Sequence, residues 1–333
     1  MLLRLWPEET KVAFMSFRMI AVILSVSALL ASAALLATRG LNLGIDFAGG
    51  SVIEIVEPEG VTPGDVREIV ETAGITGDIV INSARSTGEN ATDLEVIRFK
   101  TQEPREGENA EAAQQNANNR VRAALTEALG DPNLSAEEAE EALIRSSAAV
   151  GPKVSGELLQ AGITALVTAL ALMMVYISFR FQWQYAVGAV AALFHDVILT
   201  TGIFSLTGFE FNLATIAALL TIVGYSMNDT VIVFDRVREE ARKYKKLELS
   251  KVVDLAVNAT MSRTLLTSGT TLLALLSIFL FGGDVLRGMS FGLIFGVIVG
   301  TYSSIFVASA VLLFLGIDRG DKPKREVEGF TGV

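Results

Sequence analysis

The chain has 333 residues, 51% of them hydrophobic, and its mean hydropathy of +0.47 is too high for an ordinary soluble domain. It contains no cysteine and one histidine, which excludes disulfides, thiolate metal sites and a histidine-rich metal cluster. The net charge of −10 is concentrated in residues 39–157, where 22 acidic residues face 10 basic ones, and this argues against nucleic-acid binding.

The first expected element is a membrane span over residues 17–38, preceded by a short cytoplasmic segment over residues 1–16. Basic residues before an apolar run are also typical of a cleaved signal peptide. This run is longer than a typical signal core and no clear cleavage site follows it. We therefore interpret it as an uncleaved anchor.

Residues 39–157 form the only large region without a span, and their pattern predicts an α+β domain. Four segments predict strands: 51–57, 78–83, 92–100 and 143–149. Three segments carry apolar residues at helical spacing: 62–73, 110–129 and 136–142. The order β-α-β-β-α-β is typical of a ferredoxin-like domain, with an antiparallel sheet and helices on one side.

Five more apolar runs predict the remaining spans: 158–179, 184–207, 211–234, 264–281 and 288–316. Residues 235–263 form a loop with eight Lys and Arg residues, and the amphipathic stretch 248–261 within it predicts a helix on the membrane surface. A polar tail over 317–333 closes the chain. The expected fold is therefore an α-helical membrane protein with six transmembrane helices and one extracytoplasmic α+β domain between the first two.

Charge gives the expected orientation, because short loops rich in Lys and Arg stay in the cytoplasm. Four segments hold nearly all such residues: 1–16, the turn around Arg180, 235–263 and 317–333. The short loops on the other side hold only Arg287. Both termini are thus expected in the cytoplasm, and residues 39–157 on the opposite side of the membrane.

Asp229 is the main candidate for chemistry, because a carboxylate in an apolar span is costly unless it pairs, neutralises or meets water. Ser226 and Asn228 lie close to it in the sequence and are expected to take part in the same ion coupling. Arg263 begins the next span at the same predicted membrane face and could pair with the carboxylate when it is charged. An interfacial charge at Asp229 and a plain positive-inside arginine are the structural alternatives.

His195 and Asp196 are two adjacent titratable residues near the middle of the third span. A hydrogen-bonding role within the bundle is one interpretation. The other is an upper stage of a proton path that ends at Asp229. The sequence shows no nucleophile–base pair, phosphate loop or metal set, so we expect ion coupling without enzymatic activity and without a cofactor other than protons or Na⁺.

Glycine marks two further features. Four glycines at every fourth position of the last span predict a smooth face for close helix packing: Gly288, Gly292, Gly296 and Gly300. A second cluster joins the first span to the first strand and allows a tight turn there: Gly44, Ile45, Asp46, Phe47, Gly49 and Gly50. Spacing alone assigns Asp46 no more than a capping or bracing role.

Several stretches resemble the SecF family of the bacterial Sec export apparatus, within the resistance-nodulation-division superfamily. They are GIDFAGG at 44–50, VGPKV at 150–154, FHD at 194–196, VGYSMNDTVIVFDRVRE at 223–239 and SRTLLTSGTTLLALLSIFLFGG at 262–283. The resemblance covers essentially the whole chain. Ala48 departs from the usual Thr, and residues 101–118 resemble a longer insertion in the outer domain.

The resemblance implies a partner and a substrate that spacing does not give. Six spans would pack against six from SecD, and the complex would use the proton gradient, or sodium, to pull an unfolded preprotein from the SecYEG channel. Asp229 and Arg263 match positions expected to take part in proton passage, and Asp46 with its glycines matches the motif below the outer domain.

Two other functions remain open from the residues: a half-transporter of the same superfamily for a lipid or small molecule, and a non-transporting chaperone or assembly scaffold. The outer domain of about 120 residues is small for a transporter that needs a substrate tunnel. If the chain acts in protein export, protonation of Asp229 would free Arg263 and shift the fourth and fifth spans, and this shift would tilt the outer domain.

Overall fold

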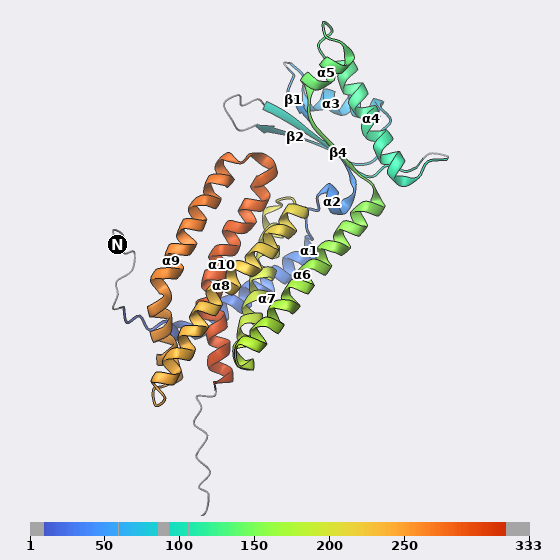
Figure 1. Cartoon of the computed structure of the whole chain (residues 1–333). Helices are drawn as coiled ribbons and strands as arrows, with labels where there is room; N and C mark the ends of the chain where they lie inside the picture. Colours follow the sequence, from blue (N-terminus) through green and yellow to red (C-terminus); the bar gives the residue numbers. More distant parts are fainter. Residues whose placement is uncertain (1–9, 59, 86–92, 105–106, 318–333) are drawn as a thin grey trace, which may run out of the picture.

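The computed structural model describes residues 10–58, 60–85, 93–104 and 107–317. It consists of a long helix bundle with a smaller α+β domain at one end (Figure 1). Within these residues, six helices are long and apolar enough to cross a membrane. The predicted fold class, six spans with an α+β domain between the first two, is confirmed. Most of residues 1–16 and of the tail lie outside the described residues.

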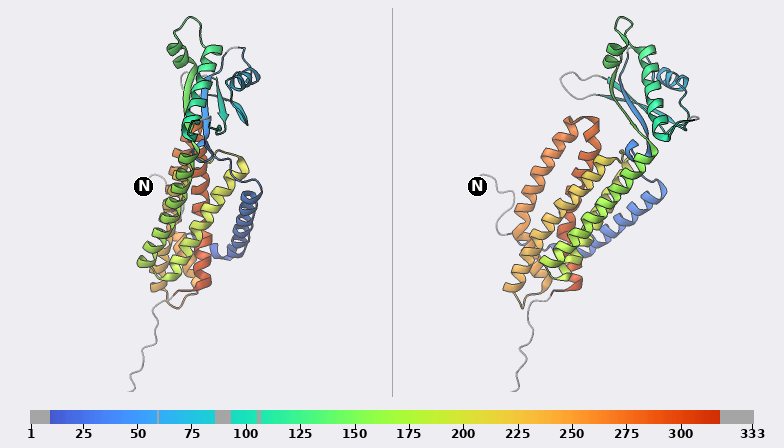
Figure 2. Two further views of the ribbon diagram at one scale, coloured as in Figure 1. Left: turned by 90° about the vertical axis from the view of Figure 1, so that its right-hand side faces the viewer. Right: turned by 45° about the vertical axis from the view of Figure 1, so that its right-hand side comes forward.

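The bundle is built from one short 3-10 helix and six long α-helices. Their bounds are Phe14–Phe17 (η1), Arg18–Thr38 (α1), Pro152–Arg180 (α6), Trp183–Thr207 (α7), Leu213–Lys243 (α8), Leu249–Phe281 (α9) and Gly283–Leu315 (α10). Helices α7, α8 and α10 form its centre, whereas α1, α6 and α9 lie around them (Figure 2). Most side chains of α6 therefore lie on the outside of the bundle.

The predicted surface helix over 248–261 is wrong, because these residues are the first part of α9 and continue into the fifth span. Their apolar face is covered by protein and not by lipid headgroups. Val253, Ala256 and Val257 are buried in one core cluster with Phe234 and Val237 of α8. Helix α8 likewise runs past residue 234 to Lys243, so only a short turn separates the two helices.

The second span also begins earlier than its hydropathy predicts. Helix α6 starts at Pro152, directly after the last strand of the domain, and Pro is favoured at this first helical position because its missing N–H has no partner there in any case. Residues 152–157, which precede the predicted span, therefore belong to the same continuous helix and connect the domain directly to the membrane bundle.

The α+β domain has a four-stranded antiparallel sheet in the order β2-β3-β1-β4. Its elements are Gly50–Val56 (β1), Pro63–Thr72 (α3), Ile79–Arg85 (β2), Asp93–Phe99 (β3), Ala110–Leu129 (α4), Ala136–Leu143 (α5) and Ile144–Val150 (β4). Strand β3 lies between β1 and β2, which is the split β-α-β arrangement of a ferredoxin-like fold. Apolar residues of the sheet and of α3, α4 and α5 form its core.

Local sequence explains where these helices begin. Thr62 and Asp65 form a reciprocal capping box at α3, and Ser135 and Glu138 form another at α5. Within the predicted insertion over 101–118, Gln102 is buried and its N–H donates to Gln114 of α4 at 2.8 Å. The described part of this insertion is therefore packed onto the domain.

Candidate functional site: a buried polar network in the helix bundle

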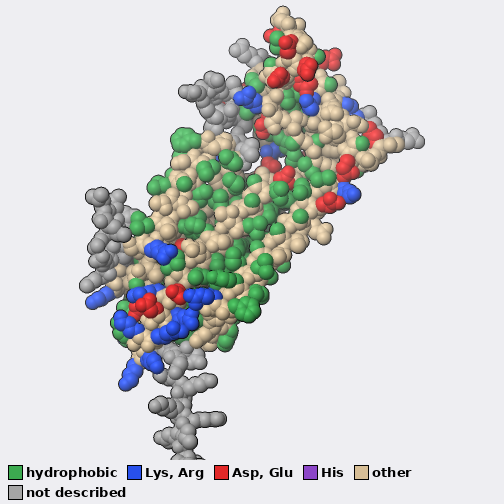
Figure 3. All heavy atoms as spheres, in the orientation of Figure 1, with side chains coloured by type: hydrophobic (Ala, Val, Ile, Leu, Met, Phe, Trp, Pro, Cys, Tyr) green, Lys and Arg blue, Asp and Glu red, His purple; other side chains and the backbone are tan. Residues whose placement is uncertain are grey.

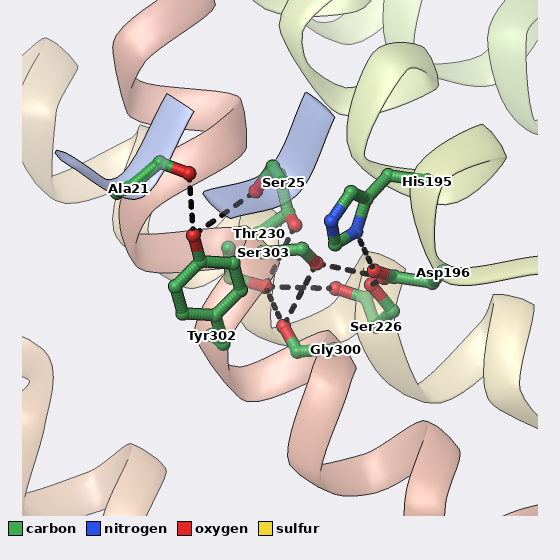
Figure 4. A network of polar contacts seen from close by, with 10 residues as sticks. Ala21, Ser25, His195, Asp196, Ser226, Thr230, Gly300, Tyr302 and Ser303 are labelled. Atoms are coloured by element: carbon green, nitrogen blue, oxygen red, sulfur yellow. Dashed lines mark hydrogen bonds and ion pairs between the residues drawn. The ribbon is translucent and has the colours of Figure 1, made fainter. Parts of the chain in front are cut away.

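Asp196 of α7 is the centre of a buried polar network (Figure 4). Its Oδ1 lies 2.9 Å from Nδ1 of His195, and its Oδ2 accepts hydrogen bonds from Ser226 Oγ at 2.5 Å and Ser303 Oγ at 2.7 Å. All four residues are buried. Because Ser226 belongs to α8 and Ser303 to α10, one carboxylate joins the three central helices. Hydrogen bonds of this kind compensate for taking a carboxylate out of water.

Hydroxyl groups extend the network along α10. Ser304 donates to the carbonyl of Gly300 at 2.8 Å and lies 2.9 Å from Thr230 of α8. Two residues earlier, Tyr302 donates to the carbonyl of Ala21 and contacts Ser25, both of α1 (Figure 4). The network thus reaches the peripheral helix as well as the centre.

Asp229 lies one turn beyond Ser226 on α8, with only 1% of its surface exposed. Neither carboxylate oxygen has a hydrogen-bond partner among the described residues. A charged carboxylate in this position is expensive, because no donor replaces the water it has lost. Binding a proton or a cation would remove that cost.

The expected pair between Asp229 and Arg263 is not formed in this structure. Arg263 lies on the exposed face of α9, within electrostatic range of Asp229 but without an ion pair to it. Its neighbour Thr264, and not Arg263, points into the bundle. Asn228 is also exposed, because one residue along a helix turns the side chain by about 100° away from the buried face. The structure therefore brings Ser226, but not Asn228 or Arg263, to the polar network.

The glycines of α10 bring the helices close enough for these contacts. A Cβ added at Gly300 would lie 3.1 Å from Cβ of Ser226, and one at Gly292 would lie 2.9 Å from the ring of Phe204. Gly296 packs even more tightly against Ile222. A Cβ added at Gly288 would be in ordinary van der Waals contact, 3.6 Å from the carbonyl oxygen of Glu210. Close approach at Gly300 is what lets Ser303 and Ser304 reach α7 and α8.

The junction motif lies where the domain meets the loop between α7 and α8. Residues Ile45–Ala48 form a short helix, α2, and Phe47 packs against Phe211 in a buried cluster. The carboxylate of Asp46 accepts a hydrogen bond from the backbone N–H of Leu213, the first residue of α8, at 2.9 Å. Gly44 donates to the carbonyl of Phe211 at 3.0 Å. The motif therefore anchors the domain to the start of the helix that carries Asp229.

Two glycines at the end of the motif have conformations that other residues rarely adopt. Gly49 has φ +70° and Gly50 has φ +120°. A Cβ at Gly50 would also lie 2.6 Å from the carbonyl oxygen of Phe99 on the neighbouring strand. This tight turn directs the chain from the membrane surface into β1.

Sequence reasoning missed Ser303 and the ion pair between Arg98 and Glu210. The available signal for Ser303 was the polar group TYSS in an otherwise apolar span, one turn after the last predicted packing glycine. Arg98 of β3 lies 2.6 Å from Glu210 in the α7–α8 loop, so it gives the domain a second contact with that loop. The two residues are 112 positions apart, and no local pattern links them.

Comparisons with known proteins agree with this architecture. Residues 132–318 match the family model "Protein export membrane protein SecD/SecF, C-terminal", and residues 34–56, which include the junction motif, match "SecD/SecF GG Motif". The SecF protein translocase subunit of Rhodobacter capsulatus is 42% identical, over 98% of this chain and 96% of the relative. That of Vibrio alginolyticus is 38% identical, over 96% of both.

Solved structures give the same assignment. The crystal structure of SecDF from Thermus thermophilus, a translocon-associated membrane protein, is similar with a TM-score of 0.74 and 30% identity. The match covers 93% of this chain but 39% of that one. SecDF in a super-membrane-facing form is similar with a TM-score of 0.63. The chain thus spans well under half of the SecDF chains that it resembles.

Proposed function

The chain belongs to the SecF family of protein translocase subunits, and from this membership we propose that it couples ion movement through its bundle to protein export by moving its α+β domain. The observation that carries the proposal is Asp229, a buried carboxylate without a hydrogen-bond partner among the described residues. Its protonation changes the charge inside the bundle by one unit. One elementary charge crossing 100 mV supplies about 2.3 kcal/mol, which is enough to shift the equilibrium of a helix between two positions.

The connection between ion and domain runs along α8. Asp229 lies 16 residues after Leu213, so about 24 Å of continuous helix separates it from the hydrogen bond to Asp46. In the proposed cycle, protonation of Asp229 lets α8 move relative to α9 and Arg263, and the Asp46–Leu213 contact passes the movement to the domain. The Asp196–His195 pair supplies an earlier stage of the ion path, on the side of Asp229 that is nearer to the α+β domain.

We propose SecD as the partner that completes a twelve-helix bundle, and SecYEG with an unfolded preprotein as the functional target. Support comes from SecDF, whose single chain holds more than twice the matched length. It also comes from the bundle itself, because only 6% of the most apolar stretch of α6 is buried within this chain. A second set of spans would cover exposed helix faces, including the face of α8 that carries Asn228.

The proposed orientation places the α+β domain outside the cytoplasm of a bacterial cell. On the face drawn in Figure 3, most Lys and Arg side chains gather at the end of the bundle far from that domain. Basic residues of short loops favour the cytoplasmic side of a membrane. The proposed coupling ion is the proton, because one proton is enough to neutralise the buried, unpartnered carboxylate of Asp229, whereas a cation would need several oxygen ligands; Na⁺ is the alternative.

The test is preprotein release from vesicles containing the chain with SecD and SecYEG, measured with and without a proton gradient. Asp229→Asn is expected to abolish the gradient-dependent part of the release, because Asn cannot bind and release a proton. Arg242→Gln is the matched control, since it alters an exposed residue of the same helix that lies outside the proposed ion path. Unchanged gradient-dependent release by Asp229→Asn would overturn the coupling role.

A further inference from the structure

A crevice of about 940 Å³ lies between α1, α7 and α10, and His195 and the first residues of α9 are also among its lining residues. Its walls are mainly apolar side chains of these three membrane-spanning helices, such as Val22, Val26, Val187 and Val307. The volume is at the upper end of the range of small-molecule pockets. Of the residues used in the proposed ion-coupling cycle, His195 alone is among those that line this crevice.

The depth of the crevice corresponds to one leaflet of a bilayer. Arg18 and Leu29 both line it, and these residues are separated by about 16 Å along α1 at 1.5 Å per residue. On α7 the deepest lining residue, His195, is near the middle of the helix. The hydrocarbon core of a bilayer is about 30 Å thick, so the crevice spans about half of it. An acyl chain has the matching length and polarity.

The mouth of the crevice holds one residue of each charge, at the end of the bundle far from the α+β domain. Arg18, the first residue of α1, and Glu248, the N-cap residue of α9, are both exposed and line the crevice. Neither forms an ion pair with another described residue. A guanidinium binds phosphate through two parallel hydrogen bonds, and a carboxylate accepts hydrogen bonds from a primary ammonium group.

These two charges select among membrane lipids. A purely anionic headgroup would satisfy Arg18 but would be repelled by Glu248. A choline headgroup has no N–H to donate to the carboxylate. The ethanolamine headgroup carries a phosphate and a primary ammonium a few bonds apart, and therefore complements both residues.

We propose that the crevice between α1, α7 and α10 binds one phosphatidylethanolamine molecule of the leaflet opposite the α+β domain. Its phosphate binds Arg18, its ammonium group binds Glu248, and one acyl chain occupies the apolar crevice toward His195.

The test is native mass spectrometry of the full chain released from nanodiscs that contain equal amounts of phosphatidylethanolamine, phosphatidylcholine and phosphatidylglycerol. The wild type is expected to retain phosphatidylethanolamine over the other two by about tenfold, the size expected from about one charge-assisted hydrogen bond. Glu248→Gln is expected to remove the preference over phosphatidylcholine. Arg18→Gln is expected to lower retention of all three lipids.

Ala310→Phe tests the crevice itself, because the added ring would occupy the space of the acyl chain. It is expected to lower retention, whereas Arg242→Gln, an exposed change at the same end of the bundle, is expected to leave it unchanged. If a variant unfolds in the nanodisc, lipid-induced thermal stabilisation of the wild type by each headgroup gives the same comparison. Equal retention of the three lipids, or a preference for phosphatidylglycerol, would overturn the proposal.

Discussion

The carboxylate of Asp46 caps the start of the helix that carries Asp229, through a 2.9 Å hydrogen bond from the backbone N–H of Leu213. The first N–H groups of a helix have no partner within it, and a negative charge there is favourable because it interacts with the helix dipole. The contact joins two segments 167 residues apart. The junction motif therefore contacts one end of α8, the helix that also carries the buried carboxylate of Asp229.

Asp46→Ala is expected to lower the free energy of unfolding by about 1 kcal/mol, the usual cost of losing a helix cap. Thermal unfolding in detergent measures this change. Asp46→Asn is the control, because it keeps a hydrogen-bond acceptor while removing the charge, and a smaller loss is expected. Equal losses for the two variants would show that the hydrogen bond does not contribute.

Gly296→Ala is expected to destabilise the bundle by about 1–3 kcal/mol, because the added methyl group would overlap Ile222 of α8. Gly288→Ala, eight residues earlier on the same helix, adds a methyl group at ordinary van der Waals distance from its neighbours and should be neutral or stabilising by up to about 1 kcal/mol through helix propensity. Thermal unfolding of the two variants in the same detergent provides the comparison. Similar effects would contradict the packing role assigned to Gly296.

Breaking the ion pair between Arg98 and Glu210 is expected to loosen the domain on the bundle. The Arg98 and Glu210 side chains are 37% and 24% exposed, and the resulting solvent screening limits the contribution of the ion pair to about 1 kcal/mol or less. Spin labels on the domain and on α9 should show a broader distance distribution for Glu210→Gln than for the wild type. Lys100→Gln, which breaks an ion pair with Asp78 inside the domain, should leave that distribution unchanged.

Glu95 makes the stability of the α+β domain depend on pH. The side chain is buried, and its oxygens have no hydrogen-bond partner among the described residues. Burial raises the pKa of Glu95, and the nearby negative charge of Glu57 raises it further. The folded state therefore holds this proton to higher pH than the unfolded state does. Stability is full below the unfolded pKa and falls as pH rises toward the folded pKa.

Glu95→Gln removes the titrating group, so the variant is expected to be more stable than the wild type at pH 7 and to lose this difference toward pH 4. Thermal unfolding followed across this range measures the effect. Glu71→Gln is the control, because Glu71 is exposed on α3. A pH-independent difference between Glu95→Gln and the wild type would refute the assignment.

Local patterns were sufficient for the architecture. Membrane spans depend on the length of apolar runs, and strands and helices on short-range periodicity, so both are local properties of the sequence. The order of elements in the α+β domain follows from the same patterns. The surface helix over 248–261 shows the limit, because an amphipathic face that packs on protein has the same sequence pattern as one that lies on lipid.

The sequence by itself determined that Asp196 and Asp229 lie in membrane spans, where a carboxylate requires compensation. Only the tertiary structure decided what surrounds each carboxylate. Asp196 accepts hydrogen bonds from hydroxyl groups of two other helices, whereas Asp229 has no hydrogen-bond donor among the described residues. The physical reason is that helix rotation and spacing depend on close packing at distant positions. Gly300 lets α10 approach α8, and the rotation of α9 turns Arg263 outward while Thr264 faces the bundle.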